Sequence, residues 1–371
     1  MKMNNKLGIV VHEDFALKHI PPYPKPAFIS FESPLRIKSV IEFLNKKKFF
    51  DDNRIIKIVP ESIDEDILLL AHSQYHIDSI KKISNMGGGL LDEDVFVCDD
   101  SFELAKKAVG GAIQALKNVI NQQVNYSFAF LRPPGHHAFR EKASGLCIFN
   151  NIATSILYLR KRLNYDRKIA IIDIDNHFGD GLAQYFYEDP TVLYFSIHEF
   201  DFSQADLGFL DELGTGKGLG KNINFPIPEN LSDDQFLEIL GFLIPILKEY
   251  NPDLMIVAAG FDMYFADPIG NCCLTTTGYY NFTKNLMNVA EEICDGKISF
   301  ILEGGYSIIG LQFCVYAVLS ALLDKDFEAP EFEQNVLSNG VNNEQFSKIM
   351  EALKLQLSPY WNCLKDKTFS Y

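Results

Sequence analysis

The sequence contains no uninterrupted apolar segment of the roughly 18 residues that a membrane-spanning helix requires. Its first apolar run, Leu7 to Val11, is too short for the core of a signal peptide. Positive charge is also scarce, because 34 lysines and arginines stand against 49 aspartates and glutamates, giving a formal net charge of -15. Sequence-independent binding of nucleic acid depends on basic side chains that neutralise phosphates. These absences predict a cytoplasmic protein without nucleic-acid or membrane partners, and they favour a cationic substrate.

The cysteine pattern and the composition are those of an ordinary globular protein. The seven cysteines form no CxxC pair, and several lie in apolar runs such as LQFCVYAVL, which predicts buried thiols in a reducing compartment. Hydrophobic residues make up 47% of the chain and charged residues 22%, which excludes a fibre and a largely disordered chain. At 371 residues the chain is long enough to bury a large core, and we expect a single domain over residues 1–371.

Continuous apolar runs recur from residue 127 onward. Such runs are typical of strands that are buried on both faces of a parallel sheet. They are SFAFL (127–131), KIAIIDID (168–175), TVLYFSIH (191–198), DLMIVAAGFD (253–262) and KISFILEGG (297–305). Helical patterns lie around them, at 101–116, 151–163, 180–187, 232–250, 278–294 and 307–323. The alternation predicts an α/β fold with three layers, α/β/α, around a mostly parallel central sheet with right-handed crossovers.

The flanking segments add a few elements to this plan. The first 100 residues contain another strand, a helix in PLRIKSVIEFLNK and a glycine-rich segment, GGGLLDED (87–94), that we expect to be a mobile loop. A last amphipathic helix is predicted at about 344–358, where it would pack on the core.

Histidines, carboxylates and a tyrosine occur where the predicted strands end. In an open parallel sheet, the loops that leave the carboxyl ends of the strands build the binding site. The residues are His136 and His137 after the first run, Asp173, Asp175 and His177 at the second, His198 at the third, Asp262 at the fourth, and Glu303 and Tyr306 at the fifth. We therefore expect them to meet at one edge of the sheet.

Asp175, His177 and Asp262 have the chemistry of a catalytic metal site. An Asp-x-His pair places both side chains on one face of an extended segment, and a carboxylate from a neighbouring strand end can complete the set. One imidazole and two carboxylates suit Zn²⁺ with open coordination positions, although Fe²⁺ and Mn²⁺ also accept such ligands. Taken singly, each of the three residues could instead cap a turn or a helix.

His136 and His137 lie in RPPGHHA, where two prolines restrict the backbone and a glycine permits a tight turn. Two carboxylate ligands neutralise much of an ion's charge, so a separate base becomes important, and paired histidines can transfer the protons. Asp173 and Asp180 are the carboxylates available to orient them. Tyr306 follows two glycines in EGGY and could donate to a developing oxyanion. The alternatives are ordinary loop histidines on the surface and a simple strand-to-helix turn at EGGY.

The order of these motifs resembles that of the metal-dependent deacetylases of the histone deacetylase superfamily. The chain has RPPGHHA at 132–138, GLCIFNN at 145–151, DIDNHFGDG at 173–181, GFDMYFADP at 260–268 and EGGY at 303–306. Weaker similarity at PLR, which ends at Arg36, and at AHSQYHI extends the resemblance to most of the chain. FLDELGTGKGLGKNINFPIP and TTTGY are most similar to the acetylpolyamine amidohydrolase branch, which deacetylates small cationic amines. The resemblance implies an arginase/deacetylase-like fold.

The resemblance also gives a role to the residues at the strand ends. It implies that Asp175, His177 and Asp262 bind Zn²⁺. It further implies that His136 is the general base and that His137 is the general acid or an electrostatic partner.

The remaining catalytic roles follow from the same resemblance. Asp173 and Asp180 would orient the two histidines, and Tyr306 would polarise the scissile carbonyl. A structural K⁺ is implied as well, and its ligands would be Asp173, Asp175, His177, Ser196 and the carbonyl of Ile197. The polyamine branch also implies a homodimer.

The sequence departs from the family pattern around the expected substrate channel. Leu146, after Gly145, replaces the phenylalanine that usually forms one wall, and Phe178 stands in place of the second histidine of HHG. Without the usual Tyr-Pro after His198, the opposite wall is left to Phe200 or Phe202. These changes affect the expected substrate preference more than the expected chemistry.

The sequence therefore predicts a zinc hydrolase that removes acetyl or another short acyl group from an amine, such as an acetylpolyamine or acetyl-lysine. Two alternatives are open. A ureohydrolase of the arginase type would hold two manganese ions, but the single Asp262 in GFDMYF lacks the doubled aspartates expected for it. A catalytically silent protein that binds acetylated amines would not need every catalytic position to be filled.

Overall fold

The computed structural model describes residues 5–21, 30–92, 94–204, 206–334, 336 and 340–365. Its centre is an eight-stranded sheet in the order β2-β1-β5-β10-β9-β6-β7-β8, in which every neighbouring pair is parallel. The strands are β1 (Leu7–Val10), β2 (Ile55–Ile58), β5 (Tyr126–Ala129), β6 (Ile169–Asp173), β7 (Val192–Glu199), β8 (Asn222–Ile227), β9 (Leu254–Ala259) and β10 (Ile298–Leu302).

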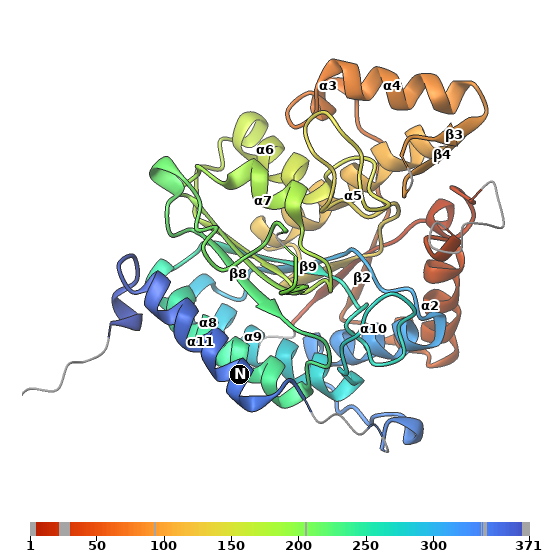
Figure 1. Cartoon of the computed structure of the whole chain (residues 1–371). Coiled ribbons are helices and arrows are strands. Elements are labelled where there is room, and N and C mark those ends of the chain that lie inside the picture. The colour runs from red at the N-terminus through yellow and green to blue at the C-terminus, as the bar shows by residue number, and fades with distance from the viewer. Residues whose placement is uncertain are drawn as a thin grey trace, which may run out of the picture.

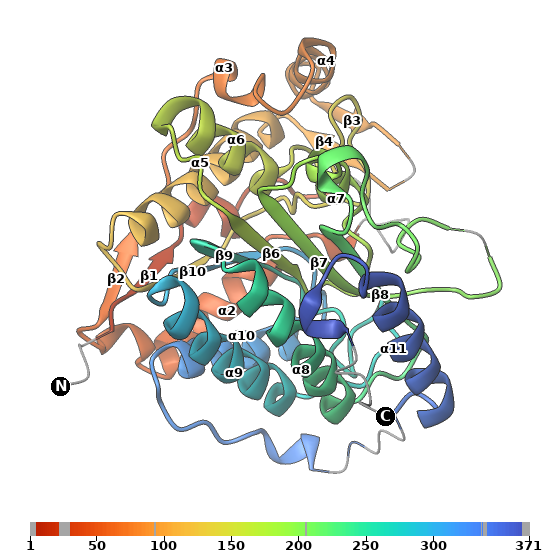
Figure 2. The same ribbon diagram turned by 90° about the vertical axis from the view of Figure 1, so that its left-hand side faces the viewer.

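Helices cover both faces of this sheet, as Figures 1 and 2 show. One layer consists of α2 (Leu35–Lys46), α8 (Asp233–Tyr250), α9 (Thr276–Cys294), α10 (Ile308–Leu322) and α11 (Asn343–Leu357). The other contains α5 (Ser101–Ile120), α6 (Asn151–Leu163) and α7 (Asp180–Phe186), with α3 (Glu65–Leu68) and α4 (Gln74–Asn85) beyond them. The predicted three-layer α/β/α fold is confirmed. Within the described residues, no helix is long and apolar enough to span a bilayer.

The central strands form where the sequence has continuous apolar runs, because both faces of these strands are covered. All residues of β5, β6, β9 and β10 are buried. The edge strands β2 and β8 have no such run and were not predicted. β2 is only partly buried, and β8 contains the buried polar residues Asn222 and Asn224 followed by Pro226. Edge strands have one unpaired side, which tolerates proline and a broken apolar pattern.

The glycine-rich segment that we expected to be a loop is in part a β-hairpin. β3 (Gly88–Leu90) pairs with β4 (Phe96–Cys98) in an antiparallel ladder. Gly88 has a φ of +103°, and a Cβ there would lie 2.4 Å from the carbonyl oxygen of Val97. The hairpin needs both the positive φ and the close approach, and glycine provides both. Glu93 lies outside the described residues.

Candidate active site

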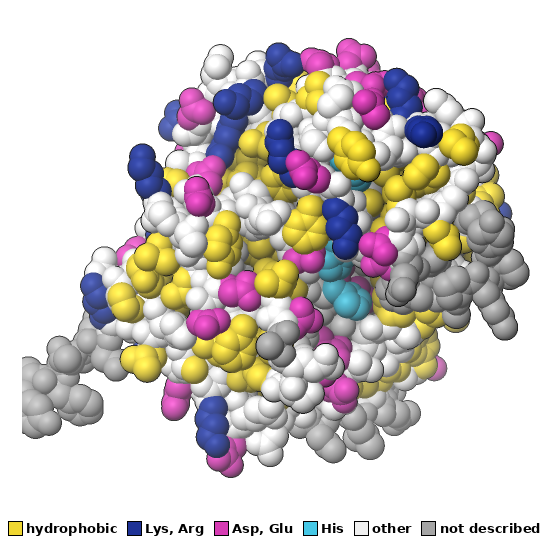
Figure 3. Space-filling view, turned by 45° about the horizontal axis from the view of Figure 1, so that its top comes forward, with side chains coloured by type: hydrophobic (Ala, Val, Ile, Leu, Met, Phe, Trp, Pro, Cys, Tyr) yellow, Lys and Arg dark blue, Asp and Glu magenta, His cyan; other side chains and the backbone are white. Residues whose placement is uncertain are grey.

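Four adjacent strands at the centre of the sheet carry the predicted site residues. The strands β5, β10, β9 and β6 are neighbours, and the chain leaves each of them at the same edge. The residues after them are His136 and His137, Glu303 and Tyr306, Asp262, and Asp175 and His177 respectively. Figure 3 shows histidine side chains in the middle of one face, with acidic and hydrophobic side chains close by.

Asp175, His177 and Asp262 form a compact cluster of donor atoms. Nδ1 of His177 lies 3.2 Å from Oδ1 of Asp175 and 3.1 Å from Oδ2 of Asp262, and the ligand atoms of the three residues all lie within 4.8 Å of one another. The other carboxylate oxygens are fixed by backbone N–H groups, since Gly304 donates to Asp175 and Asn176 donates to Asp262, both at 2.8 Å. Two oriented carboxylates and one imidazole fit a divalent cation.

The electrostatics of the cluster also favour a cation. Burial and the charge of Asp175 raise the pKa of Asp262 to about 7. Burial would raise the pKa of Asp175 as well, but His136 and His177 hold it below its usual range. Although burial opposes it, the bonds to both carboxylates raise the pKa of His177 to about 10. The negative charge of Asp175 and Asp262 is thus partly offset by the proton on His177, which lies between the two carboxylates. A metal ion could take the place of that proton.

The two neighbouring histidines each contact a different carboxylate. Their ring centroids are 4.1 Å apart. Nδ1 of His136 lies 3.2 Å from Oδ2 of Asp173, and Nδ1 of His137 lies 2.8 Å from Oδ1 of Asp180. These are the partners proposed from the sequence. Such contacts fix the ring orientation and leave the Nε2 atoms free for chemistry.

The environments of the two imidazoles are different. His136 is 3% exposed, and the charges of Asp175 and Asp173 raise its pKa well above the usual value despite its burial. Burial and the charge on His136 lower the pKa of His137. Glu303 fixes the loop that carries the two histidines, because its Oε2 accepts hydrogen bonds from the backbone N–H groups of Gly135 at 2.6 Å and His136 at 3.1 Å. A cation held by Asp175 would offset the charge that most raises the pKa of His136, so that this ring could act as a base, and it would also relieve the charge that lowers the pKa of His137.

Tyr306 is held by two residues whose roles were not predicted. Its backbone N–H donates to Oδ2 of Asp267 at 2.7 Å, and the Arg36 guanidinium lies 4.6 Å from its ring centroid. Arg36 also donates to the carbonyls of Glu303 at 2.5 Å and Gly305 at 2.8 Å. The turn EGGY is therefore fixed from both sides. The available signal in the sequence was that Arg36 ends the PLR motif and that Asp267 lies in the GFDMYFADP motif.

The expected channel walls are only partly brought together. Gly145 packs against His137, because a Cβ at this glycine would lie 2.3 Å from Cδ2 of that ring. Leu146 is buried and has a φ of +66°. Phe200 and Phe202 belong to an aromatic cluster with Phe209 after β7, where ring centroids are 5.2 to 6.3 Å apart. Within this cluster, the side chain of Phe202 is exposed.

Three of the residues expected to bind K⁺, Asp173, Asp175 and Ser196, lie close together. The register of β6 and β7 places Asp173 beside Ser196, and Asp175 donates its N–H to Oδ1 of Asp173 at 3.2 Å. The Ser196 hydroxyl contacts Nδ1 of His198 at 2.8 Å, and Nε2 of that histidine contacts the carbonyl of Gly208 at 2.9 Å.

The fold and this arrangement of residues are those of a known family of hydrolases. Residues 30–322 match the histone deacetylase domain, and the chain belongs to the histone deacetylase family. The crystal structure of the HDA15 HD domain superposes with a TM-score of 0.83 at 26% identity, over 97% of this chain and 96% of that one.

The curated relatives place the chain among deacetylases. A probable deacetylase of Archaeoglobus fulgidus is 33% identical over 96% of this chain and 99% of its own length. The polyamine deacetylase HDAC10 of Danio rerio is 35% identical over 72% of this chain and 41% of its own, and histone deacetylase 18 of Arabidopsis thaliana is 32% identical over 98% and 53%. The chain thus spans nearly all of the archaeal relative and about half or less of these eukaryotic ones.

Proposed function

We propose that the protein is a zinc-dependent amidohydrolase that removes acetyl or short acyl groups from amines. The observation that carries the proposal is the convergence of Asp175, His177 and Asp262 beside two histidine–carboxylate pairs and a tyrosine. A zinc ion held by these three residues would supply a Lewis acid for the scissile carbonyl and the attacking water. The deacetylase relatives support the same reaction class.

The residues around the cluster can perform the proton transfers and bind the developing charge. Nε2 of His136 lies 3.8 Å from Oδ1 of Asp175, so this edge of the ring faces the metal ligands and can take a proton from water there. His137, with Asp180 behind it, can return a proton to the leaving amine. Tyr306 retains its phenolic proton, because burial raises its pKa well above the usual value, and it can donate to the oxyanion.

A two-metal ureohydrolase is less well supported. Among the described residues, a second group with donor atoms close together is His136, Cys147 and Glu303. It shares no residue with the first group, so no carboxylate bridges the two, whereas paired catalytic ions lie about 4 Å apart. Glu303 is also engaged by two backbone N–H groups. We therefore favour one zinc ion per chain over two manganese ions.

The substrate class divides into small acetylated amines and acetyl-lysine in peptides. The acidic chain, with a net charge of -15, favours cationic acetylpolyamines, and HDAC10 is named for polyamines. Histone deacetylase 18 supports acetyl-lysine as the second candidate. A structural K⁺, a homodimer and a cytoplasmic location stay predictions.

The decisive experiment measures acetate release by the zinc-loaded protein. Acetylputrescine, an acetyl-lysine peptide and longer acyl amines would be compared, and bound zinc would be counted per chain. Replacing Tyr306 with Phe keeps the ring against Arg36 and the backbone bond to Asp267, and removes only the hydroxyl. We expect turnover to fall by about 100-fold or more. Near-normal turnover of that variant would disprove the role of Tyr306, and a zinc-loaded wild type without activity on any substrate would disprove the proposal.

A further inference from the structure

A buried tyrosine on β7 contacts the carboxylate that orients His136. Tyr194 is 1% exposed, and its hydroxyl donates to Oδ2 of Asp173 at 3.0 Å. The same oxygen atom lies 3.2 Å from Nδ1 of His136. The hydroxyl also lies 3.3 Å from the carbonyl oxygen of Gly179. The Tyr194 hydroxyl therefore contacts the carboxylate of the Asp173–His136 pair. It also contacts Gly179, which immediately precedes Asp180, the carboxylate that contacts His137.

Gly179 marks the point where these groups meet. A Cβ at this position would lie 2.5 Å from Oδ2 of Asp173, 2.7 Å from the Tyr194 hydroxyl and 2.9 Å from Nδ1 of His136. Gly179 also immediately precedes α7, whose first residue, Asp180, contacts His137. A small shift of this glycine would thus move parts of both pairs.

The hydrogen-bond directions around Asp173 are well defined. Burial and then the charge of Asp173 raise the pKa of Tyr194 well above its usual value, so the phenol keeps its proton and acts as the donor. Oδ1 of Asp173 accepts the backbone N–H of Asp175. Both carboxylate oxygens are therefore occupied, and rotation of the carboxylate would break a bond to Tyr194. Hydrogen bonds to charged groups are among the stronger ones in proteins.

We propose that Tyr194 is a positioning residue that holds Asp173, and through it His136, in the orientation needed for proton transfer. The role rests on the deacetylase reaction proposed above and deepens it. Among the described residues, the Tyr194 hydroxyl contacts none of the three proposed zinc ligands and no residue of the Tyr306 turn. Its effect on catalysis would pass through Asp173.

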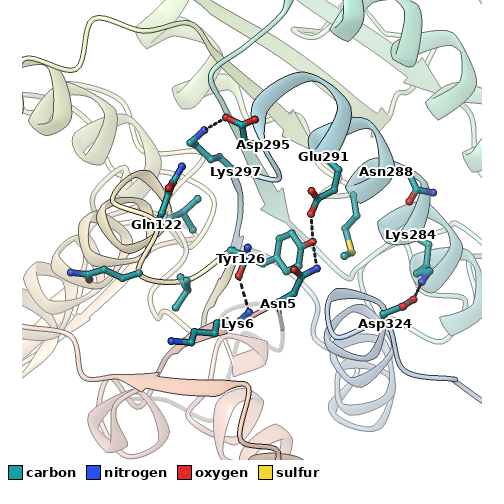
Figure 4. Close-up of a pocket in the computed structure, with 15 residues that line it drawn as sticks. Asn5, Lys6, Gln122, Tyr126, Lys284, Asn288, Glu291, Asp295, Lys297 and Asp324 are labelled. Atoms are coloured by element: carbon teal, nitrogen blue, oxygen red, sulfur yellow. Dashed lines mark hydrogen bonds and ion pairs between the residues drawn. The ribbon is translucent and has the colours of Figure 1, made fainter. Parts of the chain in front are cut away.

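The first test compares Tyr194→Phe with a matched control in the zinc-loaded protein. Tyr126 is also buried on a strand, and its hydroxyl donates to Oε1 of Glu291 at 2.5 Å, but it lies at the amino end of β5, in the hollow of Figure 4. We expect Tyr194→Phe to lower kcat about tenfold with KM unchanged, and Tyr126→Phe to leave both constants unchanged. Equal kcat values for the wild type and Tyr194→Phe would overturn the proposal.

A double-mutant cycle with Asp173→Asn separates positioning from general destabilisation. If Tyr194 acts through Asp173, the Phe substitution should have little further effect on kcat in the Asp173→Asn background. A full tenfold loss in that background would instead indicate an independent structural effect, and would overturn the proposed route.

A spectroscopic measurement keeps the inference testable even if the substrate is misassigned. The Nδ1–H resonance of His136 can be recognised by its loss in Asp173→Asn. Because Tyr194→Phe removes a competing donor from Oδ2 of Asp173, that resonance should move downfield, while Tyr126→Phe should leave it in place. An unchanged resonance would refute the positioning role. A shifted resonance in a protein that is inactive on the whole substrate panel would refute only the proposed function.

Discussion

The substitution Glu32→Gln should destabilise the protein by a measurable and predictable amount. Glu32 is fully buried, and its two oxygens accept bonds from Arg132 at 2.7 and 2.6 Å. Arg36 donates to the same carboxylate at 3.2 Å. Glutamine preserves the volume but removes the charge that balances two buried guanidinium groups. Breaking a buried ion pair by removing one partner costs about 3–5 kcal/mol.

This free energy can be converted into a melting temperature. An unfolding entropy of about 2.1 cal/mol/K per residue gives about 0.8 kcal/mol/K for a chain of 371 residues, so Tm should fall by about 4–6 °C. Differential scanning calorimetry at pH 7 measures the change. Glu103→Gln is the control, because Glu103 pairs with Lys106 on the surface and should shift Tm by about 1 °C or less. Equal shifts for the two variants would refute the reasoning.

The same carboxylate gives the experiment a pH dependence. Burial would raise the pKa of Glu32, but Arg132 lowers it from 4.5 to about 2 in the folded protein. A carboxyl group whose pKa is depressed on folding stabilises the protein above its unfolded pKa, and this stabilisation is lost as the pH falls from about 4.5 toward 2. The difference in Tm between the wild type and Glu32→Gln should therefore narrow over that range. A difference that stays constant from pH 7 to pH 3 would contradict the linkage.

Three further predictions concern the proposed metal site and a buried histidine. Gly304→Ala should weaken zinc binding at least about tenfold in a competition titration, because the alanine Cβ would lie 2.4 Å from Oδ2 of Asp262. Gly241→Ala is the control and should bind zinc normally, because the new methyl group would have open space around it. Zinc at 100 times its Kd should stabilise the wild type by about 2.7 kcal/mol in thermal unfolding, and a rise of the same size in Asp262→Asn would contradict the assignment. Burial lowers the pKa of His72 from 6.5 to about 3 in the folded protein, so the stabilisation that comes from a neutral His72 is present above pH 6.5 and falls by about 2 kcal/mol by pH 5. In urea unfolding, a His72→Gln variant that loses as much stability between pH 7 and pH 5 as the wild type would exclude this.

The central part of the fold could be predicted from the sequence because burial on both faces leaves a continuous apolar pattern. The runs at 168–175 and 253–262 contain β6 and β9, at the middle of the sheet. The edge strands β2 and β8 were missed because one side of each is unpaired, which relaxes the pattern. The hairpin at Gly88 was missed because glycine-rich sequence is typical of loops as well as of close backbone contacts.

The candidate site divides in a similar way. Asp175, His177 and Asp262 could be grouped from the sequence because ionisable residues at the ends of buried strands are unusual. Tyr194 and Arg36 could not, since their contacts depend on which strands and loops are neighbours in space. An aromatic residue on a central strand is expected in the core, and nothing in its local sequence shows that its hydroxyl meets a carboxylate from the next strand.

The donor atoms of the proposed metal site come from strands that are widely separated along the chain, and this affects when the site can form during synthesis. A nascent chain that has reached Asp175 and His177 still lacks Asp262, and the backbone N–H that donates to Asp175 arrives only with Gly304. The strand that carries Gly304 is inserted between two strands that were made earlier, so some 300 residues must leave the ribosome before the proposed site can form. Chains truncated before Asp262 would therefore lack one of the three proposed ligands.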